Sequence, residues 1–321
     1  MNAPNPDETN NPDDASNPDE AMGPGDMDST SPPPETPDDL GDVTYSPCTR
    51  AARVGAFTIE LAERFTGVQG QVSSGVVDAN VPDEVASEGT CRLLEGRTLF
   101  CDPACAGGET CSAEGSCEPY PENVSVGTIA ISGMQEGVSI EPRAPINLYT
   151  NTGTLPHPGF SPGAELVLSA QGGDLEPFSL HVTGIEALDV SGEAIAVAAG
   201  QDAAVTWSAP SELSSAQIHL ELNVNNHGSR LAWLECDVED TGSFALPSSL
   251  VDRLLDLGVS GFPTLSIFRR SADSVELEPG CIEFEAISGF DLDVMLEGLT
   301  SCTEDDDCPE GQSCQEDLTC Q

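Results

Sequence analysis

Polar and apolar residues alternate most clearly between Ala216 and Val238. Residues 217–225 alternate without a break, and a period of two places the apolar set on one face of a β-strand. Residues 226–229 contain Asn and Gly, which tolerate positive φ and predict a turn. The alternation returns over 230–238. We therefore predict a β-hairpin, and its apolar face needs a second sheet to cover it.

Further short segments with strand character fill the chain up to residue 289, separated by Gly, Pro or Asn. One amphipathic helix interrupts them, capped by Ser248 or Ser249 and ended by Gly258. The pattern predicts a mainly β protein, an antiparallel β-sandwich of the Ig-like or jelly-roll-like kind. The expected strands are 126–131, 165–169, 178–183, 203–207, 216–225, 230–238, 264–269 and 281–287.

The expected organisation has five parts. Residues 1–44 hold 12 acidic residues, 9 Pro and no basic residue, so they predict a disordered acidic linker. A calcium-binding run is the less favoured alternative there, because the loop glycine of an EF-hand is missing. The other parts are a small antiparallel β region at 45–99, a Cys-rich unit at 100–121, the β-sandwich with one short helix at 122–300, and a C-terminal Cys-rich unit at 301–321.

The two Cys-rich units repeat one pattern. The last three cysteines of each are separated by five residues each time, and Gly108 and Gly311 occupy the same place between them, as expected for a turn with positive φ. Units this small have no core of their own, so crosslinks must define them. Four cysteines allow three pairings. We predict Cys101–Cys111, Cys105–Cys117, Cys302–Cys314 and Cys308–Cys320, and by elimination Cys48–Cys91 and Cys236–Cys281.

Charge changes the picture of partners. The 321 residues carry a formal net charge of -46, with ten Arg and no Lys. The missing Lys excludes Schiff-base, Ser-Lys and P-loop chemistry. A surface this acidic disfavours nucleic acid and anionic membranes, and it favours a soluble monomer. Hydrophobic residues still make up 38% of the chain, which with Gly is enough for a globular core.

Twelve cysteines, an even number, indicate disulfides and an oxidising compartment outside the cell or at its surface. The start of the sequence is an acidic tail without a signal peptide, and no apolar run is long enough to span a bilayer. We therefore expect that an export leader precedes Met1 or that the start is misplaced.

The acidic tether is followed along the chain by CRLLEGRTLFCDPACAGGETC, WLECDVEDTGSFALPSSLVDRLL and DDDCPEGQSC. In this order the features resemble a group of uncharacterised exported bacterial lipoproteins, and the Cys-rich units are similar to short Dickkopf-like repeats. The resemblance implies export and a lipid anchor upstream of Met1, although no lipobox Cys precedes the tether. It brings no known activity and no catalytic residues.

Few residues suggest chemistry. His219 and Glu221 share a strand face, and with His181 from a neighbouring strand they would suit a metal-assisted hydrolase. Exposed polar positions of a strand are the favoured interpretation. Trp233 is a candidate binding platform if its face is solvent-exposed, and a packing residue if that face is covered.

Two acidic groups complete the candidates. Glu283 and Glu285 have a spacing that a glycosidase pair could use and that many surface strands share. Residues 305–307 are three Asp that could hold calcium, although a solvated turn is favoured.

We expect no catalytic residues, no metal and no cofactor. The predicted function is a non-catalytic exported surface protein that binds an unidentified protein or glycan ligand or has a structural role. The alternatives are a metal-assisted extracellular hydrolase and a calcium-ordered structural protein.

Overall fold

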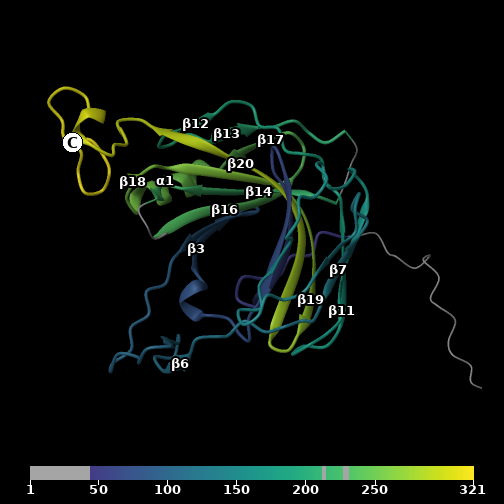
Figure 1. Cartoon of the computed structure of the whole chain (residues 1–321). Helices are drawn as coiled ribbons and strands as arrows, with labels where there is room; N and C mark the ends of the chain where they lie inside the picture. Colours follow the sequence, from purple (N-terminus) through teal and green to yellow (C-terminus); the bar gives the residue numbers. More distant parts are fainter. Residues whose placement is uncertain (1–43, 212–214, 227–230) are drawn as a thin grey trace, which may run out of the picture. The chain divides into compact units, whose positions relative to one another are not determined.

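The structure is a computed structural model that describes residues 44–211, 215–226 and 231–321. It is mainly β, as predicted (Figure 1). The helical elements are η2 (Asp78–Asn80), α1 (Ser248–Asp256) and η3 (Asp305–Asp307). The strands are β1 (Arg53–Leu61), β2 (Thr66–Val72), β3 (Asp83–Glu88), β4 (Cys91–Glu95), β5 (Glu109–Cys111), β6 (Cys117–Pro119), β7 (Ile129–Ser132), β8 (Val138–Ile140), β9 (Tyr149–Thr150), β10 (Glu165–Ala170), β11 (Phe178–Thr183), β12 (Ala194–Val197), β13 (Ala203–Thr206), β14 (Gln217–Asn223), β15 (Asn225–Asn226), β16 (Ala232–Glu239), β17 (Ser243–Leu246), β18 (Ser260–Gly261), β19 (Thr264–Leu277) and β20 (Gly280–Leu296).

A ten-stranded sheet forms the centre of the described chain, in the order β3-β4-β16-β14-β19-β20-β1-β2-β9, with β12 also paired to β20. The expected hairpin is present, because β14 pairs antiparallel with β16 and Leu222 lies opposite Leu234. Residues 227–230 of its turn lie outside the described residues. The long hairpin β19–β20 joins both halves of the sheet, since β20 runs parallel to β1 at one end and to β12 at the other.

Two hydrophobic clusters pack against one face of this sheet. The first lies between β1, β2 and β20 and the four-stranded sheet β11-β10-β7-β8, so the two sheets form a sandwich. The second lies between β14, β16 and β19 and the group of β12, β13, β17 and α1. Figure 1 shows β7 and β11 beside one part of β19, and β12, β13 and β17 near the other part of the hairpin.

The sheet alternation separates a buried apolar face from a polar face. On β14, Ile218, Leu220 and Leu222 are fully buried, while His219 and Glu221 point the other way. On β20, Ile282 and Phe284 belong to the first cluster, and Glu283 lies on the polar face between them. The polar face therefore collects charged residues from β14, β20 and the strands beside them.

Two expectations differ from the structure, and a third falls on residues that it does not describe. Residues 45–99 are no separate β region, because β1 to β4 belong to the ten-stranded sheet. The helix begins after Pro247 without a side-chain cap of its own, and the Ser248 N–H instead donates to Asp202 at 2.9 Å. The acidic linker 1–44 lies outside the described residues except for Thr44. Within the described chain, no helix combines the length and apolar character that crossing a membrane requires.

All twelve cysteines form disulfides. The four bonds predicted within the Cys-rich units are present, and Gly108 and Gly311 both have positive φ, as the repeat predicts. The two pairings obtained by elimination, Cys48–Cys91 and Cys236–Cys281, are wrong. The structure joins Cys91 to Cys236 and Cys48 to Cys281 instead.

The register explains the correction. Cys91 on β4 lies directly opposite Cys236 on β16, with 4.1 Å between their Cα atoms. Cys281 lies inside β20 on the face of Glu283 and Glu285, opposite the apolar cores. Its partner therefore has to come from a segment that crosses the polar face, and Cys48 does. Six disulfides in a mainly β chain fit an exported protein.

Candidate functional site

The polar face of the ten-stranded sheet carries the largest group of interacting charges among the described residues. Four of the ten arginines of the chain lie there, and we call them the arginine cluster: Arg50, Arg53, Arg92 and Arg270. Five carboxylates accompany them: Glu221, Glu235, Asp237, Glu283 and Glu285. Positive and negative charges nearly balance here, whereas the whole chain is strongly acidic.

A strap, residues 44–50, crosses this face before β1 begins. The Ser46 N–H donates to the Ala272 carbonyl at 2.9 Å, and the Cys48 N–H donates to Glu283 Oε2 at 2.8 Å. The Cys48–Cys281 disulfide fixes the strap covalently to β20. Backbone, side-chain and covalent contacts thus hold one short segment against the centre of the sheet.

Glu235 on β16 is the acceptor for two arginines. Arg50 donates to Glu235 through Nε at 2.9 Å and also through Nη2, and Arg92 Nη2 donates at 2.6 Å. Burial alone would raise the pKa of the Glu235 carboxyl, but the charge and hydrogen bonds of Arg50 outweigh it and lower the pKa. Glu235 therefore stays ionised although only 3% of the residue is exposed.

Arg270 on β19 joins the two glutamates of β20. Its Nε donates to Glu285 at 2.7 Å, its Nη2 donates to Glu283, and its Nη1 donates to the Tyr45 hydroxyl at 3.1 Å. Burial raises the pKa of Glu283, whereas Arg270 overcomes burial and lowers the pKa of Glu285. Burial also raises the pKa of the Tyr45 phenol, which therefore stays neutral and can serve as donor and acceptor.

Asp237 connects the strap to β14. Its Oδ1 accepts hydrogen bonds from the Tyr45 hydroxyl at 3.1 Å and from His219 Nδ1 at 2.9 Å. Burial opposes ionisation of Asp237, but the hydrogen bond and charge of His219 outweigh burial and lower the pKa. His219, Glu235 and Asp237 offer ligand atoms within 4.8 Å of one another. A metal ion there would have to displace Arg50 and Arg92 from Glu235, so the geometry favours an ion-pair network.

Two cavities open onto this face. One, of about 450 Å3, is lined by the arginine cluster together with His219, Glu221 and Phe268. The other, of about 670 Å3, lies over β1 and β2, between them and the segment 75–81. Arg50, Arg53 and Glu285 line both cavities. We call the two together the arginine groove.

The structure brings two of the three proposed metal ligands together and leaves out the third. His219 and Glu221 line the smaller cavity. His181 lies on β11 in the four-stranded sheet, where its Nδ1 is 3.2 Å from a Glu165 carboxylate oxygen, and it does not line that cavity. The His219–Glu221–His181 hydrolase site is therefore not formed.

Trp233 is packed, not presented as a platform. Only 6% of the residue is exposed, and the Arg50 guanidinium lies 5.8 Å from the ring centroid.

Glu283 is fully buried and lines neither part of the arginine groove. The Glu283–Glu285 pair therefore lacks the access that a glycosidase acid and base require.

The acidic turn at 305–307 is held by its own backbone contacts. Asp307 Oδ2 accepts hydrogen bonds from the Thr303 N–H and the Glu304 N–H, and these lower the Asp307 pKa. Asp305 Oδ1 accepts from the Cys314 N–H at 2.9 Å. The carboxylates thus replace the backbone partners that the turn needs, which favours a solvated turn over a calcium site.

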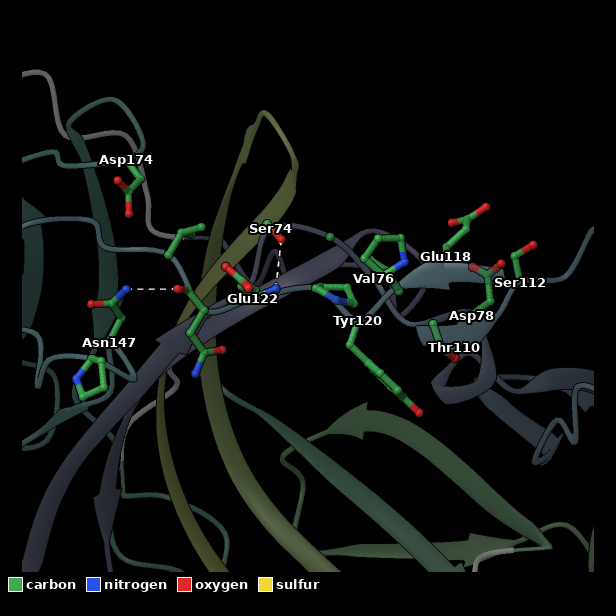
Figure 2. Close-up of a pocket in the computed structure, with 16 residues that line it drawn as sticks. Ser74, Val76, Asp78, Thr110, Ser112, Glu118, Tyr120, Glu122, Asn147 and Asp174 are labelled. Atoms are coloured by element: carbon green, nitrogen blue, oxygen red, sulfur yellow. Dashed lines mark hydrogen bonds between the residues drawn. The ribbon is translucent and has the colours of Figure 1, made fainter. Parts of the chain in front are cut away.

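A third cavity, of about 700 Å3, lies where the first Cys-rich unit meets residues 74–78 (Figure 2). Its walls are acidic, and Figure 2 shows Tyr120 extending away from the other labelled side chains. Two of its carboxylates already hold loops, since Asp78 accepts from the Ala113 N–H and Asp174 from the Ser125 N–H. These carboxylates therefore stabilise loops of the protein itself, and we do not treat the cavity as a ligand site.

Comparisons with known proteins add no family. No protein-family model matches the chain, and a search of curated proteins finds no match. Among solved structures, the chain is similar to the crystal structure of chicken CNTN1 FN1-FN3 domains. The identity is 10% over 73% of this chain and 69% of that chain, with a TM-score of 0.19.

Proposed function

We propose that the chain is an exported, non-catalytic module that binds a ligand or has a structural role, carried at the end of its acidic N-terminal tether. The observation that carries this proposal is the pairing of all twelve cysteines. The two Cys-rich units have hardly any apolar core, so they depend on their disulfides and on a compartment that preserves them.

The attachment of the strap to the sheet supports the proposed role of the N-terminal segment as a tether. The acidic residues 1–43 lead directly into Thr44 and Tyr45, and the strap is bonded to the middle of the sheet four residues later. A pull on the tether would therefore reach β20, which is flanked by β1 and β19, before it reached β1. Such an attachment suits a domain displayed at a distance from its anchor.

The first experiment measures the oxidation state of the cysteines in native material by alkylation and mass spectrometry. We expect six disulfides with the connectivity given above and no free thiol. Native protein with free thiols, or with a metal shared among them, would contradict the proposal.

The second experiment replaces both cysteines of the strap disulfide by serine, C48S/C281S. Because this bond closes a 233-residue separation, its loss is expected to lower the free energy of unfolding by about 2–5 kcal/mol. It should also make the chain sensitive to trypsin at Arg50 and Arg53. The matched control, C101S/C111S, opens a loop of separation 10 in an outlying unit and should leave the strap protected. Equal trypsin sensitivity of the two variants would contradict the attachment role.

A further inference from the structure

Arg53 stands at the junction of the two cavities of the arginine groove. Its Nη1 lies 3.7 Å from Glu283 Oε1, beyond hydrogen-bond distance, and its side chain is 40% exposed. The same Glu283 oxygen already accepts from Arg270, and Glu283 Oε2 accepts from the Cys48 N–H. Burial raises the Glu283 pKa, which further weakens this carboxylate as a counter-charge. Arg53 is thus the cation of the cluster with the weakest pairing in the described chain.

Neutral hydrogen-bonding side chains continue the groove from Arg53. Gln69 on β2 lies opposite Thr58 on β1, and Gln71 lies opposite Ala56, so both glutamines project from the polar face. Gln69 and Gln71 are exposed, and Asn80 lines the opposite wall. Primary amides both donate and accept hydrogen bonds, which matches the hydroxyl groups of a sugar.

The geometry points to an acidic glycan as the ligand of the arginine groove, with a carboxylate or sulfate group on Arg53 and sugar hydroxyls on Gln69, Gln71 and Asn80. This inference rests on the binding half of the proposed function. Arg53 would form a charge-assisted, bidentate contact with the acidic group. A groove of this size, with a few convergent polar groups, is typical of small-ligand sites.

A glycan fits better than an acidic peptide. Glu221, Glu235 and Glu285 face the smaller cavity and would repel a chain that carries a carboxylate on every residue. A sugar polymer places fewer charges among many neutral hydroxyls. The net charge of -46 adds a general repulsion against polyanions, which salt screens beyond about 8 Å at physiological ionic strength.

The test is calorimetric titration of the full chain, with its disulfides intact, at low salt and at about 0.15 M salt. The probes are an oligosaccharide in which neutral sugars alternate with a uronate sugar, an oligosaccharide of equal length with sulfated sugars in place of the uronates, the fully neutral oligosaccharide and polyaspartate. We expect binding of at least one acidic oligomer and none of the neutral one. Uronate binding alone identifies a carboxylate ligand, and sulfate binding alone identifies a sulfated one.

Three variants locate the site. Arg53→Gln should weaken binding about tenfold, equivalent to about 1.4 kcal/mol. Gln71→Ala changes an exposed side chain and should weaken binding about threefold, without risk to folding. The matched control is Arg64→Gln, which removes the same charge from an 85% exposed side chain paired only with neighbouring Glu63 among the described residues. Its affinity should not change.

Three results would overturn the inference. They are no binding of either acidic oligomer at low salt, equal losses in Arg53→Gln and Arg64→Gln, and polyaspartate binding as tightly as the best glycan. Each of these leaves the disulfide and trypsin results untouched, so failure of the ligand assignment is distinguishable from failure of the proposed function.

Discussion

Arg269 and Arg270 are neighbours on β19 that point to opposite faces of the sheet, and they use their charge differently. Arg269 is 1% exposed and lies on the apolar side. Its five N–H groups all have acceptors: two oxygens of Asp240 and the carbonyls of Glu186, Ala187 and Ser208. This buried site is closed, and its donors serve only to join segments of the fold.

Arg270 bonds to Glu283, Glu285 and Tyr45 on the polar side, and it lines a cavity that also holds three half-exposed arginines. The difference between the two arginines indicates where a ligand could bind. A guanidinium with every donor used stabilises the fold. An exposed guanidinium next to a cavity and beyond hydrogen-bond distance of its carboxylate, such as Arg53, retains capacity for binding.

The largest effect is expected from Arg269→Met. The variant leaves the Asp240 carboxylate buried, with a 4% exposed side chain and without its ion-pair partner. Loss of one member of a buried pair costs about 3–5 kcal/mol. The free energy of unfolding from urea denaturation measures it, with Arg64→Met as a surface control that should change little. A loss below that of Arg270→Met would break the comparison.

A smaller effect is expected from Arg270→Met, about 1–3 kcal/mol at neutral pH. Arg270 lowers the pKa of both Glu283 and Glu285, so its removal raises their pKa values in the folded state. A carboxyl group whose pKa is higher in the folded state than in the unfolded state stabilises the fold below its unfolded-state pKa of about 4.3. This stabilisation is lost as the pH rises through the folded-state pKa. The deficit relative to the parent protein should therefore shrink on acidification from pH 7. A deficit that stays constant with pH would contradict this.

Tyr45→Phe is expected to cost about 0.5–1.5 kcal/mol. It removes the hydroxyl that donates to Asp237 and accepts from Arg270, while the ring stays in place. The same variant should increase trypsin cleavage within the strap. The control is Tyr120→Phe at a half-exposed ring, and similar stability losses in both variants would argue against the strap contact.

The smallest effect is a change of slope with pH. The folded pKa of Asp237 is lowered, so its contribution is present above the unfolded pKa of about 3.9 and is lost as pH falls through the folded value. Asp237→Asn should flatten the decline of unfolding free energy below pH 4. Glu283 acts in the opposite direction because its pKa is raised. If the unfolding free energy of the variant fell with pH below pH 4 as steeply as that of the parent protein, the Asp237–His219 contact would not stabilise the fold.

Much of the fold could be predicted from alternation because burial on one side leaves a period of two in the sequence. The hairpin of β14 and β16 followed from it, whereas helix α1 followed from leucines repeated every three to four residues. The length of β20 did not, because Gly289 resembles a strand end. In the structure Phe268 lies opposite Gly289, and a Cβ there would come within 2.4 Å of its ring. The glycine thus lets an aromatic ring pack over a continuous strand.

The candidate site could not be predicted in the same way, since its residues come from β1, β4, β14, β16, β19 and β20. One signal was present. Cys281 falls in phase with Glu283 and Glu285, out of phase with Ile282 and Phe284. A half-cystine on the polar face needs a partner above that face, and this identifies the strap. Which strands lie beside one another, and so which arginines meet, depends on long-range pairing that alternation does not encode.

The parallel pairing of β1 with β20 has a consequence for the order of assembly. Arg53 lies beside Cys281 in the finished sheet, so the first strand must wait for more than two hundred later residues to be synthesised. Contacts at such separation slow folding and leave early segments without partners. The ten-stranded sheet of a nascent chain of this design is therefore completed only when the hairpin β19–β20 has emerged.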